Sequence, residues 1–213
     1  MKPPATDRRS PLQNRVTPFG ELAAVPSRGL FTGNRGGHFH TDARTLTGRR
    51  WASRQWICCL LEFKGRQREV WGRSYTELFF LDEATALAAG HRPCFYCRRS
   101  DANRFCAAWE QGNGVANILA REIDAVLHRE RLDGRSKRLH PLPMPPEKLP
   151  DGAMLQQGNE SFLIVQGQAH AWSPAGYRAT QTALDEAMLL TPPSTLRALS
   201  AGYRPVLHPS AQT

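Results

Sequence analysis

Two cysteines near the middle of the chain have the spacing of metal ligands. Cys94 and Cys97 are separated by two residues, and Pro93 directly before them prevents a preceding helix from continuing. A C-x-x-C turn can point two thiolates at one ion, and thiolates suit zinc better than magnesium or calcium. A structural zinc site has four ligands. The sequence therefore predicts half of a zinc site here, and two further donors must come from elsewhere.

The two further zinc ligands are expected upstream of Cys94. The apolar run over residues 56–63 predicts a strand, in which alternation separates Cys58 from Cys59 and puts Cys59 on an all-apolar face. His38 and His40 lie two positions apart, on one face of an extended segment, and His40 is the nearer to the predicted strand. Burial as a core thiol is the alternative for a strand cysteine, and Cys58 and His38 remain open as alternative ligands. The predicted zinc ligands are Cys94, Cys97, Cys59 and His40.

A short helix must position the two central cysteines. In the run FFLDEATALAAGHRPCFYCRR, Asp82 is a suitable N-cap and residues 83–89 are rich in helix formers. Gly90 can adopt the left-handed conformation that ends a helix. The sequence therefore predicts a helix of about two turns, followed directly by the C-x-x-C turn.

This run resembles a known family. FFLDEATALAAGHRPCFYC is similar to the zinc-binding segment of the Ada-type methylphosphotriester DNA-repair domain, where an aromatic strand, a short Ala-rich helix and a G-[FYH]-R-P-C-x-x-C turn come in this order. It also resembles small zinc modules appended to some bacterial nucleases. The resemblance covers residues 78–99 only, and it implies that Cys94 and Cys97 bind zinc. The family's other two ligands lie upstream, and no cysteine stands at the matching positions near residues 63–67.

The charge is concentrated in the first part of the chain. The formal net charge is +9, but residues 151–213 hold three arginines against four acids, or −1, so residues 1–150 carry +10. Arginine outnumbers lysine 24 to 4. A guanidinium group binds phosphate with two donors and stacks on bases, which favours nucleic acid, most simply DNA, as the partner. A merely solvated basic face is the alternative. The predicted nucleic-acid contacts are Arg35, Arg49, Arg50, Arg54, Arg98 and Arg99.

The predicted fold is α+β, with short antiparallel hairpins each followed by a short helix in a small zinc-stabilised module. One hairpin is expected between residues 56–63 and 67–71, and further helices are expected at 101–111 and 117–132. The expected organisation is a disordered tail over 1–13, a basic Ada-like zinc module with helices over 14–140, a Pro-rich linker over 141–150, and a last unit over 151–213.

The last unit contains an echo of the central run. When Gly202 is aligned with Gly90 without gaps, the segment around it matches Leu78, the end of the helix and the Arg92-Pro93 pair. The positions that match the two central cysteines hold Val206 and Pro209. We interpret residues 151–213 as a metal-free pseudo-repeat packed on the first half, and a recurrent helix stop is the alternative.

Composition limits the possible classes of protein. Five cysteines, an odd number, do not indicate a disulfide framework, and no apolar stretch approaches the roughly 18 residues that span a bilayer. A cytoplasmic location is therefore expected. The leading interpretation is a zinc protein that binds nucleic acid, related to DNA repair. One alternative is a metal-dependent nuclease or other enzyme acting on nucleic acid, in which some of His38, His40, His128 and His140 take part; the other is a structural or partner-binding zinc protein.

Overall fold

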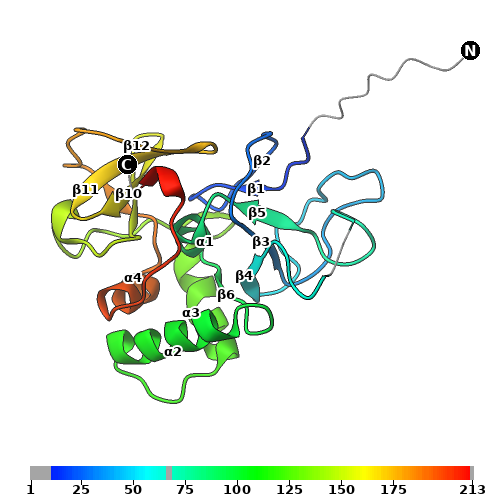
Figure 1. Cartoon of the computed structure of the whole chain (residues 1–213), viewed down its shortest axis with the longest axis horizontal. Coiled ribbons are helices and arrows are strands. Elements are labelled where there is room, and N and C mark those ends of the chain that lie inside the picture. Colours follow the sequence, from blue (N-terminus) through cyan, green and yellow to red (C-terminus); the bar gives the residue numbers. More distant parts are fainter. Residues whose placement is uncertain (1–10, 66–68, 212–213) are drawn as a thin grey trace, which may run out of the picture.

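The fold is α+β: over the part of the chain that the structure describes, two larger sheets and a two-stranded ribbon combine with four α-helices (Figure 1). The computed structural model describes residues 11–65 and 69–211. Most of the predicted tail over 1–13 and part of the predicted return strand over 67–71 lie outside these residues. Gln13, at the end of that tail, is described, and its side chain donates to the Leu22 carbonyl at 2.8 Å.

The first sheet has six strands in the order β2-β1-β5-β3-β4-β6. Its strands are β1 (Arg15–Val16), β2 (Leu22–Ala23), β3 (Phe31–Arg35), β4 (Trp56–Leu60), β5 (Leu78–Phe80) and β6 (Arg92–Pro93). The β1–β5 and β4–β6 pairs are parallel and the others are antiparallel.

The predicted strand over 56–63 forms, but not in the predicted hairpin. Its first five residues are β4, which pairs with β3 and β6. The segment after it turns away because Trp71 is held by Glu77: the Trp71 backbone N–H donates to Glu77 Oε2 at 2.8 Å, and the indole N–H donates to the Glu77 carbonyl at 2.9 Å. Gln67 and Arg68 of the expected return strand lie outside the described residues.

Strand alternation gives the first sheet two different faces. One face packs into the buried core, and the other carries a mixture of polar and apolar side chains together with Cys59. The core face includes Phe31, Cys58, Leu78 and Phe80. The second face includes Thr32, Asn34, Ile57, Cys59 and Phe79. The candidate metal centre therefore lies on the side of the sheet away from its core.

The helices are α1 (Glu83–Ala88), α2 (Arg99–Asn113), α3 (Ala120–Arg131) and α4 (Pro193–Ser200). Asp82 caps α1 as predicted, by accepting from the Thr85 backbone N–H at 2.9 Å. Helix α2 begins earlier than predicted, with Arg98 as its N-cap, and ends at Gly114, whose φ is +64°. Phe105 and Trp109, one turn apart on this helix, are buried.

A second sheet of five antiparallel strands lies at the C-terminal end, in the order β12-β11-β10-β9-β13. Its strands are β9 (Met154–Gln157), β10 (Glu160–Val165), β11 (Gln168–Ser173), β12 (Gly176–Ala179) and β13 (Met188–Leu189). A two-stranded ribbon of β7 (Leu132–Asp133) and β8 (Ser136–Lys137) follows α3, and two 3-10 turns are η1 (Pro146–Lys148) and η2 (Pro209–Ala211).

The segment over 141–150, predicted as a linker, packs on the second sheet. Leu149 is buried in the core of that sheet, and Leu142 and Met144 are partly buried against it. The segment is thus part of the C-terminal packing.

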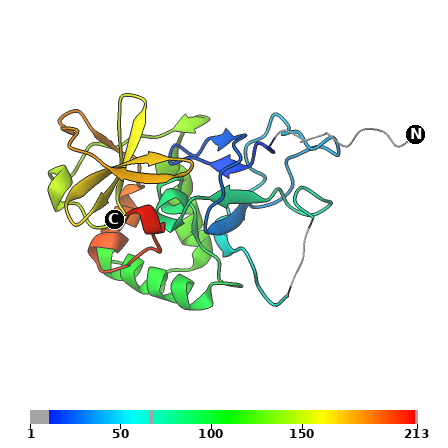
Figure 2. The same cartoon turned by 45° about the horizontal axis from the view of Figure 1, so that its top comes forward.

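Residues 151–211 pack on the first half through α1 and α2 (Figures 1 and 2). Asp82 accepts from the Tyr177 hydroxyl at 3.0 Å and from the His208 backbone N–H at 3.1 Å. The neighbouring Glu83 accepts from the Tyr203 hydroxyl at 2.6 Å. The two acids that begin the central helix therefore connect both halves of the chain.

The sequence echo corresponds to two similar helix ends. Gly90 and Gly202 have φ of +85° and +103°, and each donates its backbone N–H to the carbonyl three residues earlier, at 2.9 and 3.0 Å. The sheets around them differ, since β5 joins a mixed sheet and β13 an antiparallel one. Ser194, aligned with the cap Asp82, lies inside α4 and donates to Glu130 instead. Duplication stays a hypothesis.

Candidate metal centre

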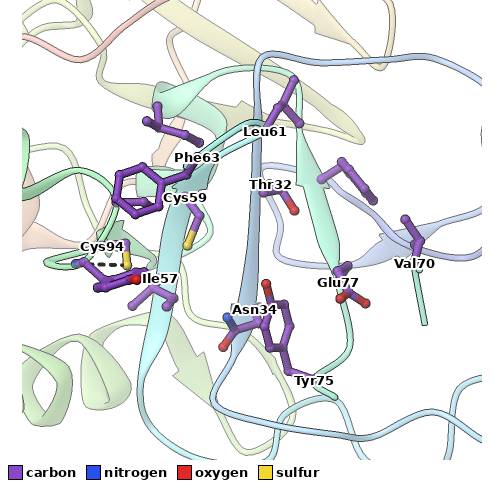
Figure 3. Close-up of a pocket in the computed structure, with 14 residues that line it drawn as sticks. Thr32, Asn34, Ile57, Cys59, Leu61, Phe63, Val70, Tyr75, Glu77 and Cys94 are labelled. Atoms are coloured by element: carbon purple, nitrogen blue, oxygen red, sulfur yellow. Dashed lines mark hydrogen bonds between the residues drawn. The ribbon is translucent and has the colours of Figure 1, made fainter. Parts of the chain in front are cut away.

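Three cysteine sulfurs converge beside the first sheet. The Sγ atoms of Cys59, Cys94 and Cys97 all lie within 4.8 Å of one another, and Figure 3 shows the sulfurs of Cys59 and Cys94 directed toward the same space. Three thiolates of a tetrahedral zinc ion, each at about 2.3 Å from the metal, stand about 3.8 Å apart. The arrangement can therefore hold a metal ion with little adjustment.

The backbone fixes these sulfurs. Cys59 points to the second face of the sheet because it alternates with the core residue Cys58. The backbone N–H of Cys94 donates to the Cys58 carbonyl at 3.0 Å, which joins the C-x-x-C turn to β4. The Arg98 backbone N–H then donates to the Cys94 carbonyl at 2.9 Å and leads into α2. Sheet, turn and helix together set the distances between the thiols.

Hydrogen bonds among the three thiols make them chemically unequal. Donation from Cys59 and Cys97 lowers the pKa of the Cys94 thiol, and the backbone N–H of Tyr96, 3.4 Å from its sulfur, acts in the same direction. Hydrogen bonding to Cys94 is the main cause that raises the pKa of Cys59. Negative charge in the cluster is therefore most favourable on Cys94, the thiol at the centre of these hydrogen bonds.

Cys58 and Cys106 lie outside the cluster. Cys58 is fully buried in the core of the first sheet, where burial raises its pKa, and its sulfur accepts from the Arg98 guanidinium at 3.5 Å. Cys106 is half-buried on α2. The structure thus brings Cys59, and not Cys58, beside the central pair.

His40 is not brought to the three sulfurs. Its Nδ1 lies 2.7 Å from the Thr76 hydroxyl oxygen and its Nε2 lies 3.0 Å from the Gly72 carbonyl oxygen. The imidazole also stacks on Trp71, with ring centroids 5.2 Å apart, and His38 lies edge-on to it. Both ring nitrogens therefore support the loop over residues 71–76, which corrects the predicted ligand set to three cysteines.

A cavity of about 340 Å³ opens beside the sulfurs. Its lining is mostly apolar and includes Cys59, Cys94 and Cys97, while Asn34 and Glu77 contribute polar groups (Figure 3). Glu77 is 4% exposed, and its Oε1 has no hydrogen-bond partner although Oε2 accepts from Trp71. The fourth position of a metal held by the three thiolates would thus be available to a ligand in this cavity.

Two of the six predicted nucleic-acid contacts are buried. Arg35 is 1% exposed and Arg98 is 3% exposed. The Arg98 guanidinium pairs with Glu83 at 2.9 Å and with Asp101 at 2.8 Å, so its charge is already matched inside the protein. Arg35 stacks on Trp56, with its guanidinium carbon 3.9 Å from the ring centroid. Neither side chain is exposed on the outer surface of the protein, and Arg35 can meet a ligand only through the cavity that it lines.

The other predicted contacts are exposed. Arg49, Arg50 and Arg54 lie on the segment that leads into β4, and Arg99 begins α2 directly after the C-x-x-C turn. Trp51, half-buried among the first three, has its ring centroid 5.9 Å from that of Trp56. The exposed arginines of this segment therefore flank a half-buried tryptophan.

Sequence reasoning did not single out Glu77, Arg131 or Lys137, which all line cavities. One signal was available for Glu77: it immediately precedes the apolar strand β5, and a carboxylate so close to a buried strand needs a reason. Arg131 and Lys137 looked like ordinary charged residues at the end of a helix and in the ribbon after it. Only the tertiary fold shows that they are inside.

Comparison of the chain with protein-family models, with curated proteins and with solved structures finds no match. The site must therefore be interpreted from its own chemistry. Among the described residues, no helix has both the length and the apolar composition needed to cross a membrane.

Proposed function

We propose that the chain is a zinc protein that binds nucleic acid, with DNA as the first candidate. The observation that carries the metal part is the convergence of Cys59, Cys94 and Cys97 within 4.8 Å. Three thiolates favour zinc over the hard cations magnesium and calcium, which prefer oxygen. The bound ion would connect β4 to the turn after β6, and so stabilise the module.

The exposed arginines support the nucleic-acid part. Arg49, Arg50 and Arg54 extend from one segment around Trp51, and Arg99 lies beside the metal turn. Such a surface can bind phosphates and stack on a base. The resemblance to the Ada-type segment agrees with this proposal, since an aromatic strand, a short helix and the C-x-x-C turn follow one another as that family has them.

The salt dependence of binding tests the proposal. If the four exposed arginines each neutralise a phosphate of duplex DNA, the slope of log K against log salt is about −3.6, at about −0.9 per contact. Replacing Arg49 and Arg54 together by alanine should make this slope shallower by about 1.8. The matched control is Arg178→Ala, an exposed arginine of β12 in the C-terminal half, which should leave the slope unchanged. Wild-type protein without salt-sensitive binding to any nucleic acid contradicts the proposal.

A metal-dependent enzyme acting on nucleic acid is the second candidate, and the cavity beside the thiols favours it. A zinc ion with three protein ligands keeps one position for water or substrate, and in such sites it acts as a Lewis acid. Glu77 lies beside β5, two strands away from β4, or about 9.5 Å across the sheet. The unpaired oxygen of the Glu77 carboxylate could take a proton from a group bound between Glu77 and the three thiolates.

Turnover of labelled single- and double-stranded oligonucleotides by the zinc-loaded protein tests this candidate. Glu77→Gln keeps the shape of the side chain and should reduce any turnover by about 10²-fold or more, while zinc content stays at the wild-type value. Equal turnover by the wild type and this variant would exclude Glu77 from the chemistry.

A further inference from the structure

A second cavity, of about 380 Å³, lies beside the first sheet and is lined by cations. Arg35 of β3, Arg131 at the end of α3 and Lys137 of β8 contribute to its wall, and Arg50 and Arg135 stand at its exposed side. We call it the basic cavity. Trp51 and Trp56 also line the basic cavity and add aromatic surface to its wall. Its volume is within the range of small-molecule sites.

Two buried arginines and the partly buried Lys137 are hydrogen-bonded in this cavity without being neutralised. Arg131 is fully buried and donates to the carbonyls of Gly90 and Arg54, each at 2.9 Å. Arg35 donates to the Gly20 carbonyl at 2.7 Å, and Lys137 donates to the Ala88 carbonyl. Carbonyl oxygens satisfy donors but carry no charge that balances the positive groups.

Carboxylates do not supply the missing charge. Within the described lining of the basic cavity the one acid is Glu21, which is exposed. Asp124 is near enough to favour the charge on Arg131, but both of its oxygens are 2.8 Å from donors of Arg92. Two buried arginines and a partly buried lysine without a paired anion are costly, because burial of a charge is tolerated only when it is paired.

The pKa values reflect the same excess of positive charge. Burial and the neighbouring guanidinium groups of Arg131 and Arg35 lower the pKa of Lys137 to about 7. Burial, followed by the charge of Arg35, lowers the pKa of Arg131. Each of these groups would be easier to protonate if an anion entered the cavity.

The Arg131 guanidinium is fixed in place at the wall of this cavity. The Nε of Arg131 has no hydrogen-bond partner, and its guanidinium carbon stacks 3.7 Å from the centroid of a Trp56 ring. The tryptophan holds the guanidinium plane in place. Trp51, half-buried at the opening, can take the face of an aromatic base while the anion lies deeper.

From the unpaired buried cations around this space we infer that the basic cavity is a binding site for the terminal phosphate of a nucleotide, with the base at Trp51. A phosphomonoester carries about −1.5 to −2 charges at pH 7, against −1 for an internal diester, so it matches three to four cations better. This inference rests on the proposed function, because it assigns the nucleotide to the end of a nucleic-acid strand. A free nucleotide offers the same chemistry.

Binding of matched oligonucleotides tests the inference. A short single strand is titrated into the intact protein with a phosphate or a hydroxyl at the 5′ end, and the 3′ end is varied in a parallel series. Tryptophan fluorescence reports stacking at Trp51. We expect at least tenfold tighter binding of one phosphorylated strand than of its hydroxyl counterpart. Lys137→Met should abolish this difference because it removes a cation. The fold should be kept, because the charge that is removed is partly buried and has no paired anion. Arg178→Ala is the control and should preserve the difference.

The outcomes separate this inference from the proposed function. Equal binding of all strands overturns the inference while leaving nucleic-acid binding in place. If no strand binds but a nucleoside monophosphate raises the melting temperature of the wild type and not of Lys137→Met, the cavity is supported with a free nucleotide as its ligand, and the proposed function fails. If strands, mononucleotides and inorganic phosphate all leave fluorescence and melting temperature unchanged, both are overturned.

Discussion

The motif Gly90 to Cys94 links the two sites through neighbouring side chains. Cys94 faces the metal cluster, while Arg92 forms a buried ion pair with Asp124 on α3. His91 is fully buried and its Nε2 accepts from Arg35 at 3.3 Å, and burial keeps the pKa of this imidazole well below its usual range. His91, Arg92 and Cys94 therefore contact different parts of the protein. Through His91, the segment that carries the metal turn also positions Arg35 of the basic cavity.

The pH dependence of stability tests the buried charge of Lys137. Its pKa is about 7 in the folded protein and about 10.4 when unfolded, so between these values the unfolded chain binds the extra proton. Stability should therefore rise as pH increases from about 7 toward 10, and below 7 the cost of the buried charge is fully present. Arg35 and Arg131, whose pKa values are also lowered, act in the same direction.

Urea unfolding midpoints at several pH values between 6.5 and 9.5, in a buffer without phosphate, measure this effect. Lys137→Met should flatten the rise and be the more stable protein at pH 6.5. A variant with the same slope as the wild type would show that Lys137 is not the titrating group.

At the scale of elements, local signals predicted the central helix and its ends well. Asp82, Gly90 and the apolar stripe of α2 act through neighbours in sequence, so their types are informative. The partners of β4 depend on long-range pairing instead, and no local pattern shows that β3 and β6 flank it. Strand alternation separated Cys59 from Cys58, but the sequence placed Cys59 on the all-apolar face, whereas the structure buries Cys58 in the core and puts Cys59 on the opposite face beside the C-x-x-C turn. The place of His40 depended on a loop over 71–76 that the sequence does not reveal.

Gly90 and Gly202 form a matched pair for the role of the first helix end. Both have positive φ, but a Cβ on Gly90 would lie 2.6 Å from the Cβ and Cδ of Arg131, while one on Gly202 meets no atom within 4 Å. Gly202→Ala should cost about 1 kcal/mol of unfolding free energy from backbone strain alone. Gly90→Ala should cost about 1–3 kcal/mol more, because it overpacks a buried side chain.

Urea unfolding of both variants at one pH measures these costs. Equal losses would show that Arg131 does not pack on Gly90 as the structure has it. Gly90→Ala should also weaken phosphate binding in the basic cavity, whereas Gly202→Ala should not.

At the scale of the whole molecule, the metal module depends on the C-terminal half. Asp82 is fully buried, and its partners Tyr177 and His208 both lie beyond residue 150. Glu83 likewise uses the Tyr203 hydroxyl, and α2 packs against α4. Charge suggested the division of the chain into a basic half and a neutral half, and the sequence echo led to the prediction that the second packs on the first. The side chains that join the halves could not be predicted, because they meet only in the tertiary fold.

A chain cut after residue 150 should therefore fail to fold. It leaves the carboxylate of Asp82 in the former interface without two of its donors and exposes the apolar face of α2. Size-exclusion chromatography and circular dichroism against the full chain measure this. A monomeric, helical fragment that still holds metal would contradict the expected dependence.

Zinc content and X-ray absorption of protein purified without added metal test the central claim most directly. The account predicts one zinc ion per chain, with three sulfur neighbours at about 2.3 Å and one oxygen or nitrogen neighbour at about 2.0 Å. Cys59→Ser, Cys94→Ser and Cys97→Ser should each lower the zinc content, and Cys106→Ser, outside the cluster, should not. Protein without bound metal, or zinc content that is unchanged in all three cluster variants, would contradict the account.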